Sequence, residues 1–418
     1  MVETITMKLK DIIRLIVLGM CGGTIYLLPY MKYYFFNQMV ENTGTSGQAL
    51  GYLVTIFAVA CLFLLLPGGI LADRLSSKKC IFWSLISTTL LTIVYAFTYR
   101  SYTFSLIIWF LLAFSSIFLA WPAIMKTVRT IGGERTSTAY SIYYASNGLT
   151  GALAGYITIK VYGMLAASDA ATGFFWSIMV SAIANAAVAF LLLYLLRDIK
   201  ETIEGKGGKL PTLQDSYSVM KMPVIWLIAI VMFCTYSLYV GITFFTPYLT
   251  SAFGISDEVS GTLSLVRSYI FMSLTPLTGI IADRWMKSTL KWFTIAGPVA
   301  IVCLIAVIAI GDDAGMIVPV MLLTMVAAFF VCTLYASMFS IMSECKIPLS
   351  IAGTAIGLVS IFSYTPDIII QPLFGYFVDN KQYSYIFISL AVMGMLSLMS
   401  CLLLLRRKSQ EFPEVVTR

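Results

Sequence analysis

Two charged stretches, GGILADRLSSKK at residues 68–79 and GIIADRWMKSTLK at residues 279–291, interrupt long apolar runs. Each contains small residues, then an Asp-Arg pair, then basic residues. Charged side chains are expensive to hold in hydrocarbon, so such a cluster at the end of an apolar run is typical of a loop where a helix leaves a membrane. The presence of one such loop in each half of the chain decides the predicted fold.

The composition of the 418-residue chain is typical of a membrane protein with many spans. Apolar residues make up 59%, charged residues make up 11%, and the mean hydropathy is +0.90, far outside the range of soluble domains. Apolar runs of about 18 or more residues can cross about 30 Å of hydrocarbon as helices. A β-barrel would instead show alternating segments of about 10 residues. The sequence therefore predicts an all-α membrane protein.

The apolar runs predict twelve membrane-spanning helices, with boundaries good to a few residues. Their ranges are 11–36, 47–72, 80–99, 103–127, 137–161, 172–196, 223–249, 258–281, 290–310, 315–340, 351–377 and 383–405. The first run is too long for the apolar core of a signal peptide, and no small-residue cleavage pattern follows it. We therefore expect this segment to stay in the mature protein.

The basic residues are distributed unevenly over the loops that alternate along the predicted helices. Most of the 27 lysines and arginines fall on one side, the other side holds only Lys32, Arg100, Lys160 and Lys381, and Arg267 falls inside a helix. By the positive-inside rule, we expect the basic side, which includes both termini, to face the cytoplasm of a bacterial inner membrane. The net charge of +7 follows from this bias and indicates no nucleic-acid partner.

The sequence disfavours catalytic and cofactor sites. It has no histidine, and its eight cysteines are scattered without C-x-x-C spacing, so we expect no metal site, no disulfide and no cofactor. It also lacks a G-x-x-x-x-G-K-[ST] loop for nucleotides. An enzyme, an ATP-driven pump and a signalling receptor are therefore all disfavoured.

An internal duplication is indicated by residue pairs that share one sequence separation. These are Asp73 with Asp283, Glu134 with Glu344, and Tyr26 with Tyr236. The longest polar interruption lies between the two related parts. We expect an N-terminal six-helix half at 1–196, a cytoplasmic linker at 197–222, and a C-terminal six-helix half at 223–418 that ends in a short cytoplasmic tail.

The charged loops resemble the cytoplasmic loop motif of the major facilitator superfamily, G-x-x-x-D-R followed by basic residues. The matching residues are Gly69, Asp73, Arg74 and Lys78 in the first copy, and Gly279, Asp283 and Arg284 in the second. Glycine lets neighbouring helices approach closely, and aspartate can cap a helix and pair with a basic partner. The resemblance implies two pseudo-symmetric six-helix bundles that rock about a central site, with these residues as a gate.

A narrower resemblance, to the organophosphate:phosphate antiporter branch and its bacterial relatives of the YihN type, is carried by WPAIMKTVRTIGGERTSTAYSIYYASNG at residues 121–148 and AGTAIG at residues 352–357. Those antiporters hold phosphate between two arginines, on helices 1 and 7, with help from a helix-5 histidine. The resemblance places Lys32, Tyr239 and Asn147 at these positions. Lysine lacks the bidentate fork of arginine, which disfavours a dianionic phosphate ester.

Three charged side chains are predicted within the membrane, where charge is costly and usually functional. We expect Lys32 and Arg267 to hold an anion and Asp367 to carry a coupling proton. Lys32 could instead extend to the interface. If Arg267 and Asp367 pair, they form a structural ion pair in an exchanger or uniporter that ignores the proton gradient. If they lie apart, proton symport follows.

Tyrosines recur at helical spacing near these charges and could line a cavity. The candidates are Tyr26 and Tyr30 on the first helix, Tyr140, Tyr144 and Asn147 on the fifth, and Tyr236 and Tyr239 on the seventh.

The sequence thus predicts a secondary active transporter that moves a small organic anion, of the carboxylate, sulfonate, sugar acid or sugar phosphate type, by proton symport or anion exchange. The alternative is a proton-driven exporter of hydrophobic or cationic compounds, with Asp367 as its acidic site and Arg267 structural. We expect a monomer in the lipid bilayer whose other partners are the substrate and a coupling proton or counter-anion.

Overall fold

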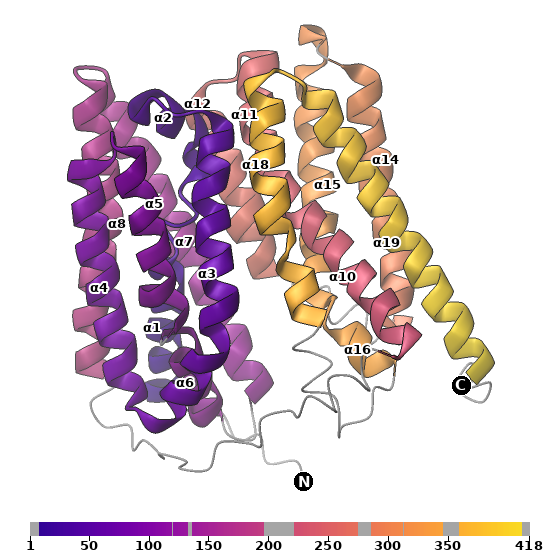
Figure 1. The fold of residues 1–418 in the computed structure, drawn as a ribbon, viewed down its shortest axis with the longest axis horizontal. Coiled ribbons are helices and arrows are strands. Elements are labelled where there is room, and N and C mark those ends of the chain that lie inside the picture. Colours follow the sequence, from indigo (N-terminus) through magenta and orange to yellow (C-terminus); the bar gives the residue numbers. More distant parts are fainter. Residues whose placement is uncertain are drawn as a thin grey trace. The chain divides into compact units, whose positions relative to one another are not determined.

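The computed structural model describes residues 8–118, 120–132, 136–195, 221–274, 286–311, 313–345 and 359–411 (Figure 1). Every regular element among them is a helix. The first eight α-helices are α1 (Leu9–Ile25), α2 (Lys32–Thr43), α3 (Gly47–Arg74), α4 (Ser77–Thr98), α5 (Tyr102–Ala113), α6 (Ala120–Gly132), α7 (Thr136–Ala166) and α8 (Ala170–Leu195). The later ones are α10 (Pro223–Gly241), α11 (Phe245–Phe253), α12 (Asp257–Leu265), α14 (Thr289–Ile310), α15 (Ile317–Ser337), α16 (Ser340–Glu344), α18 (Pro366–Asp379) and α19 (Tyr383–Glu411).

Nine helical segments among the described residues are long and apolar enough to cross a membrane. They are Gly47–Leu64, Ser77–Thr98, Tyr102–Gly132, Ile142–Ala166, Ala170–Leu195, Pro223–Phe253, Thr289–Ile310, Ile317–Ser337 and Tyr383–Arg407. Each overlaps one of the twelve predicted helices. Of the other three predictions, 258–281 and 351–377 extend beyond the described residues, and 11–36 is divided in the structure. The prediction of an all-α membrane protein is confirmed.

The prediction of one continuous first helix is wrong. α1 ends at Ile25 and α2 begins at Lys32, with turns between them. Pro29 lies in these turns and has no N–H, so it cannot donate to the carbonyl four residues earlier. The amide of Met31 instead donates to the carbonyl of Leu28 at 3.1 Å, in a tighter turn. Lys32 therefore starts a second helix.

Two further helix irregularities lie at charged residues that the sequence places within the membrane. Arg267 lies in a π-helical turn, Val266–Ile270, that follows α12. Asp367 lies in the first turn of α18, where Pro366 occupies an initial helical position. Because proline has no N–H, it interrupts the hydrogen bonds that would join the helical residues 359–364 to α18. Irregular turns of this kind are frequent at functional sites.

The chain forms two compact units. Unit 1 comprises Met1–Thr45 and Ile56–Gly208, and unit 2 comprises Ser46–Thr55 and Lys209–Arg418. The predicted linker at 197–222 lies outside the described residues except for its last two positions.

The start of α3 groups with unit 2 because α18 holds it there. The carboxylate of Asp379 accepts hydrogen bonds from the amides of Gly47 at 2.7 Å and Gln48 at 2.9 Å, and so caps α3. A Cβ atom at Gly375 would come within 2.3 Å of the Gly47 carbonyl oxygen. Glycine is therefore required at this contact between two helix backbones.

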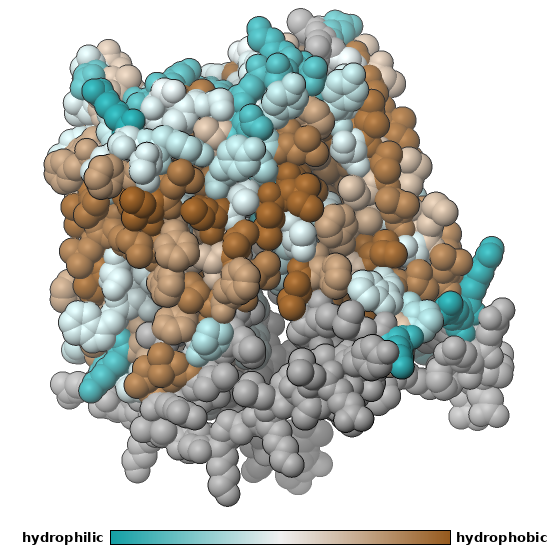
Figure 2. Space-filling model, viewed as in Figure 1, coloured by the Kyte–Doolittle hydropathy of each residue, from teal (hydrophilic) through white to brown (hydrophobic). Residues whose placement is uncertain are grey.

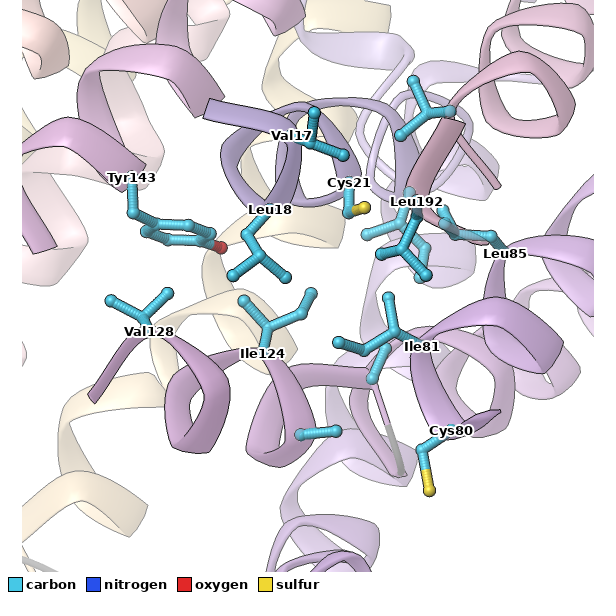
Figure 3. Packing of buried hydrophobic residues seen from close by; sticks show 14 of the residues in the cluster. Val17, Leu18, Cys21, Cys80, Ile81, Leu85, Ile124, Val128, Tyr143 and Leu192 are labelled. Carbon is cyan, nitrogen blue, oxygen red and sulfur yellow. The ribbon is translucent and has the colours of Figure 1, made fainter. Parts of the chain in front are cut away.

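The core of unit 1 is formed by apolar side chains of α1, α4, α6, α7 and α8 (Figure 3). Leu18 of α1 points toward Ile124 of α6, and Tyr143 of α7 lies close to them. Ile81 and Leu192 extend the cluster to α4 and α8. Unit 2 has its own core, from α10, α14, α15 and α19. Within hydrocarbon this packing stabilises the units by van der Waals contact.

The helix faces that point away from these cores are strongly apolar. Figure 2 shows brown, hydrophobic side chains along the helices of each unit and teal, hydrophilic ones toward helix ends. Phe63, Phe97 and Phe190 are all more than half exposed, at 77%, 73% and 63%. Such faces suit contact with lipid chains, in agreement with a membrane location.

Glycines on α1 bring this helix against α7. A Cβ atom at Gly23 would lie 2.6 Å from the backbone oxygen of Asn147, and a backbone atom cannot move aside. We expect Gly23→Ala to destabilise unit 1 by about 1–3 kcal/mol, as overpacking does. Thermal unfolding in detergent should therefore start at a lower temperature in this variant.

The matched control is Gly297→Ala on α14, where an added Cβ atom meets nothing within 4 Å. Alanine favours a helix over glycine, so this change should be neutral or stabilising. Equal unfolding temperatures for the two variants would contradict the proposed role of Gly23.

Candidate functional site

Arg267 is a buried charge in unit 2, with 1% of its surface exposed. Its Nη2 donates to Oγ1 of Thr246 at 2.9 Å, and its guanidinium carbon lies 5.8 Å from the centroid of the Phe245 ring. In the π-helical turn its backbone carbonyl accepts a 3.4 Å contact from Sγ of Cys332. Nε and Nη1 have no hydrogen-bond partner among the described residues. The guanidinium therefore keeps donors available for an anion.

Asp367 is also buried, at 4% exposed. Its Oδ2 accepts a hydrogen bond from the hydroxyl of Tyr236 at 2.6 Å, and Nε2 of Gln371 lies 3.5 Å from Oδ1. None of the contacts that the structure describes for Arg267 is to Asp367. In the described part of the chain, Arg267 and Asp367 therefore form no ion pair with each other.

Three other tyrosine rings pack around the ring of Tyr236, whose hydroxyl donates to Asp367. The ring of Tyr236 lies 6.1 Å from that of Tyr239, 5.5 Å from that of Tyr335 and 4.9 Å from that of Tyr364. Tyr239 and Tyr335 are stacked at 4.1 Å. Tyr335 and Tyr364 were not among the sequence candidates. The position of Tyr364, three residues before Asp367, was the available signal for it.

The α1–α2 break in unit 1 carries the candidates Lys32, Tyr26 and Tyr30. Lys32 is the first residue of α2 and is buried, at 3% exposed. The rings of Tyr26 and Tyr30 lie 6.0 Å apart, and Tyr30 stacks on Tyr33 at 5.1 Å. These three rings therefore contact one another although the helix that was expected to carry them is interrupted.

The α7 candidates in unit 1 differ from one another in burial and in hydrogen-bond partner. The hydroxyl of Tyr140 donates to the backbone carbonyl of Met125 at 3.2 Å. Tyr144 is 45% exposed, and its ring lies 6.4 Å from that of Tyr140. Nδ2 of Asn147 donates to the hydroxyl of Tyr143 at 3.4 Å. Tyr143, a buried residue of the same helix, was not among the sequence candidates.

The predicted gate falls mainly outside what the structure describes. Gly279, Asp283 and Arg284 lie outside the described residues, and Gly69, Asp73 and Arg74 are described only as backbone of α3. Lys78 lies in the first turn of α4.

One carboxylate near the second charged stretch does have a described role. Glu344 accepts hydrogen bonds from the hydroxyl of Ser288 and from the amide of Leu290, the latter at 3.0 Å. Both donors lie at the start of α14, so the Glu344 carboxylate caps that helix and ties α16 to it.

The arrangement in unit 2 is suited to binding and to proton exchange. Arg267 offers donors to an anion, and Asp367 with the Tyr236 hydroxyl can accept and release a proton. Among the described residues, no group of three or more His, Cys, Asp or Glu side chains is placed to hold a metal ion.

Known proteins resemble this chain over most of its length. A sequence model of the Major Facilitator Superfamily matches residues 14–370. Inner membrane protein YihN of Escherichia coli (strain K12) is 26% identical over 408 residues, which cover 96% of both chains. Inner membrane protein YqcE of the same organism is 25% identical over 397 residues, with 92% of both chains covered.

Two solved structures share the fold. A crystal structure of a mutant of the nucleoside transporter NupG superposes with a TM-score of 0.71 at 14% identity, covering 94% of this chain and 99% of that one. A bacterial homolog of the human lysosomal transporter Spinster, in an inward-facing and unoccupied conformation, gives a TM-score of 0.66 at 14% identity, covering 96% of this chain and 95% of that one. Since the family match spans most of the sequence, the chain belongs to the Major Facilitator Superfamily and is a membrane transporter that works by alternating access, not an enzyme.

Proposed function

We propose that this transporter carries a small organic anion, of the carboxylate, sulfonate, sugar acid or sugar phosphate type. The observation that supports this most directly is Arg267, whose Nε and Nη1 have no hydrogen-bond partner among the described residues although the side chain is 1% exposed. A buried charge without compensation is strongly unfavourable. An anionic substrate would supply the missing acceptors and so bind at this position.

The geometry of the guanidinium also bears on the kind of anion. With Nη2 donating to Thr246, Nε and Nη1 remain as donors on different sides of the planar guanidinium. An oxygen of a carboxylate or sulfonate can accept a hydrogen bond from either donor. The stacked Tyr239 and Tyr335 rings, in the same unit, offer apolar faces for the carbon skeleton of the substrate.

Lys32 in unit 1 is a second cationic side chain that we propose to contact the anion during the transport cycle. Its burial at 3% exposed argues against a lysine that merely extends to the interface. The neighbouring Tyr26 and Tyr30, and the α7 residues Tyr140, Tyr144 and Asn147, would add hydroxyl and amide hydrogen bonds.

We propose that transport is coupled to protons through Asp367. The described contacts of Arg267 do not include this carboxylate, so the guanidinium does not fix its charge by direct pairing. Its 2.6 Å hydrogen bond from Tyr236 joins it to a hydroxyl that can donate or accept as the proton number changes.

The remaining features of the proposal concern topology. We propose that both termini face the cytoplasm, that 1–196 and 223–418 act as the two halves around a linker, and that a monomer is sufficient. The charged loops after the second helix of each half would form the cytoplasmic gate. The basic bias of these loops supports the orientation.

A ligand screen tests the substrate class. We expect thermal unfolding of the purified protein to shift upward with one or more organic anions and not with organic cations, because a ligand that binds only the folded state stabilises it. The same anion should give no shift with Lys32→Ala and a partial shift with Lys32→Arg, which keeps the charge. Arg100→Ala, which removes an arginine of unit 1 placed over the Tyr99 ring, is the control and should behave as wild type.

A second candidate function, proton-driven export of hydrophobic or cationic compounds, is favoured by one observation. The Asp367 carboxylate accepts a hydrogen bond from Tyr236, whose ring contacts three other tyrosine rings. A carboxylate near aromatic faces also suits organic cations. Stabilisation by cations alone in the ligand screen would support this function and would contradict anion transport.

A further inference from the structure

A groove of about 460 Å³ opens in unit 2 between the start of α10 and the last turns of α19. It is lined by Lys221, Pro223, Trp226, Leu227, Ile230, Leu403 and Arg407. The transport residues described above are not among these, so the groove needs an explanation of its own.

The lining has two chemical zones. Lys221 lies two residues before the first residue of α10, and Arg407 lies near the end of α19; both side chains are exposed. The other five lining residues are apolar, and among them Ile230 is 42% exposed and Leu403 46% exposed. The groove therefore combines a cationic mouth with an apolar wall.

The position of these zones along the helices matches the edge of a bilayer. Lys221 lies just outside the membrane-spanning segment Pro223–Phe253, and Arg407 ends the segment Tyr383–Arg407. From Pro223 to Ile230 the wall extends about 10 Å along the helix axis, at 1.5 Å per residue. Trp226 lies between these two residues, and tryptophan is enriched at the membrane interface. The mouth thus lies at headgroup depth and the wall at the depth of the upper acyl chain.

We propose that this groove binds one anionic phospholipid. Its phosphate lies against Lys221 and Arg407, and an acyl chain follows Trp226, Ile230 and Leu403. The N-terminus of α10, with its partial positive charge, adds to the attraction for phosphate. Basic pockets between helices at the cytoplasmic surface suit such headgroups. A free phosphate ion would leave the apolar wall uncovered, whereas a lipid satisfies both zones.

Fluorescence quenching tests the proposal on the full-length protein in detergent. Phosphatidylglycerol with brominated acyl chains is titrated, and the quenching due to Trp226 is obtained as the difference between wild type and Trp226→Phe. Phosphatidylcholine with the same brominated chains tests the headgroup, and inorganic phosphate is added as a competitor. The charge variant is Lys221→Ala/Arg407→Ala. The control, Lys291→Ala/Arg406→Ala, removes the same charge from exposed positions of α14 and α19 outside the groove.

We expect saturable quenching of Trp226 by brominated phosphatidylglycerol, at concentrations where the phosphatidylcholine gives little. Each basic side chain near an anionic headgroup contributes about fivefold in affinity, so the charge variant should need about thirtyfold more lipid for half-quenching. The control variant should match wild type. The proposal would be overturned if the two lipids quench equally, or if the charge variant needs no more lipid than wild type for half-quenching. Full competition by millimolar phosphate would also overturn it. Thermal unfolding of every variant checks that it is folded.

Discussion

Replacing Arg267 with alanine should reduce uptake of the anionic substrate by at least about a hundredfold at low substrate concentration. A hydrogen bond to a charged group contributes about 1.5–3 kcal/mol, and the variant loses the two nitrogens that are available to the anion. The effect is expected mainly on substrate affinity. Uptake of labelled substrate into proteoliposomes, at concentrations below and above half-saturation, measures it.

Arg267→Lys distinguishes charge from geometry. Lysine keeps the positive charge but carries it on one nitrogen, whereas arginine offers donors on three nitrogens of a planar group, so we expect partial recovery relative to alanine. Arg100→Ala is again the control, and thermal unfolding shows whether each variant is folded. If Arg267→Ala folds and still takes up the anion at the wild-type rate, Arg267 does not bind the substrate and the proposed anion site is wrong.

Replacing Asp367 with asparagine should abolish accumulation driven by a pH gradient and leave substrate exchange intact. Asparagine has nearly the shape of aspartate but cannot take up and release a proton. For a symporter that moves one proton with each substrate, a gradient of one pH unit can sustain an accumulation of up to about tenfold, since one unit corresponds to 1.36 kcal/mol. We expect this accumulation in wild-type vesicles. In the variant, the substrate concentration inside the vesicles should be about equal to that outside.

Two further variants are compared with Asp367→Asn in the same vesicle assay. Tyr236→Phe removes the 2.6 Å hydrogen bond and keeps the carboxylate, so accumulation should persist with an altered dependence on external pH. Asp257→Asn changes an acidic residue in the first turn of α12 and should have no effect on coupling. Unchanged gradient-driven accumulation in Asp367→Asn would remove this residue from the coupling mechanism. Loss of exchange as well would indicate a role in substrate binding.

Local sequence was sufficient to predict the membrane helices. Whether a run such as 290–310 crosses a membrane depends on its own length and apolar content, because each helix satisfies its backbone hydrogen bonds internally. The family could also be inferred, because the motif around Asp73 and its second copy around Asp283 can be recognised in a single sequence. The sequence also contains Pro29, at the point where the structure interrupts the first predicted helix.

The environment of the charged residues could not be predicted in this way. Arg267 carries no sequence signal for its contact with Thr246, which is 21 positions away on another helix. Likewise, the hydroxyl that hydrogen-bonds Asp367 comes from Tyr236, at a separation of 131 positions. Such contacts depend on which helix faces meet, and strongly apolar helices give little periodic signal to tell a lipid-facing side from an inner one.

The sequence by itself thus determined that this protein is an all-α membrane transporter of the Major Facilitator Superfamily, and which side chains are costly enough in a membrane to be candidates for function. Only the tertiary structure decided that two nitrogens of Arg267 have no partner among the described residues. It also decided that Asp367 is hydrogen-bonded to Tyr236 rather than paired with Arg267, and that the rings of Tyr335 and Tyr364 pack against Tyr236. The physical reason is that insertion into a membrane depends on the composition of each segment, whereas the partner of a buried charge depends on packing between segments far apart in the chain.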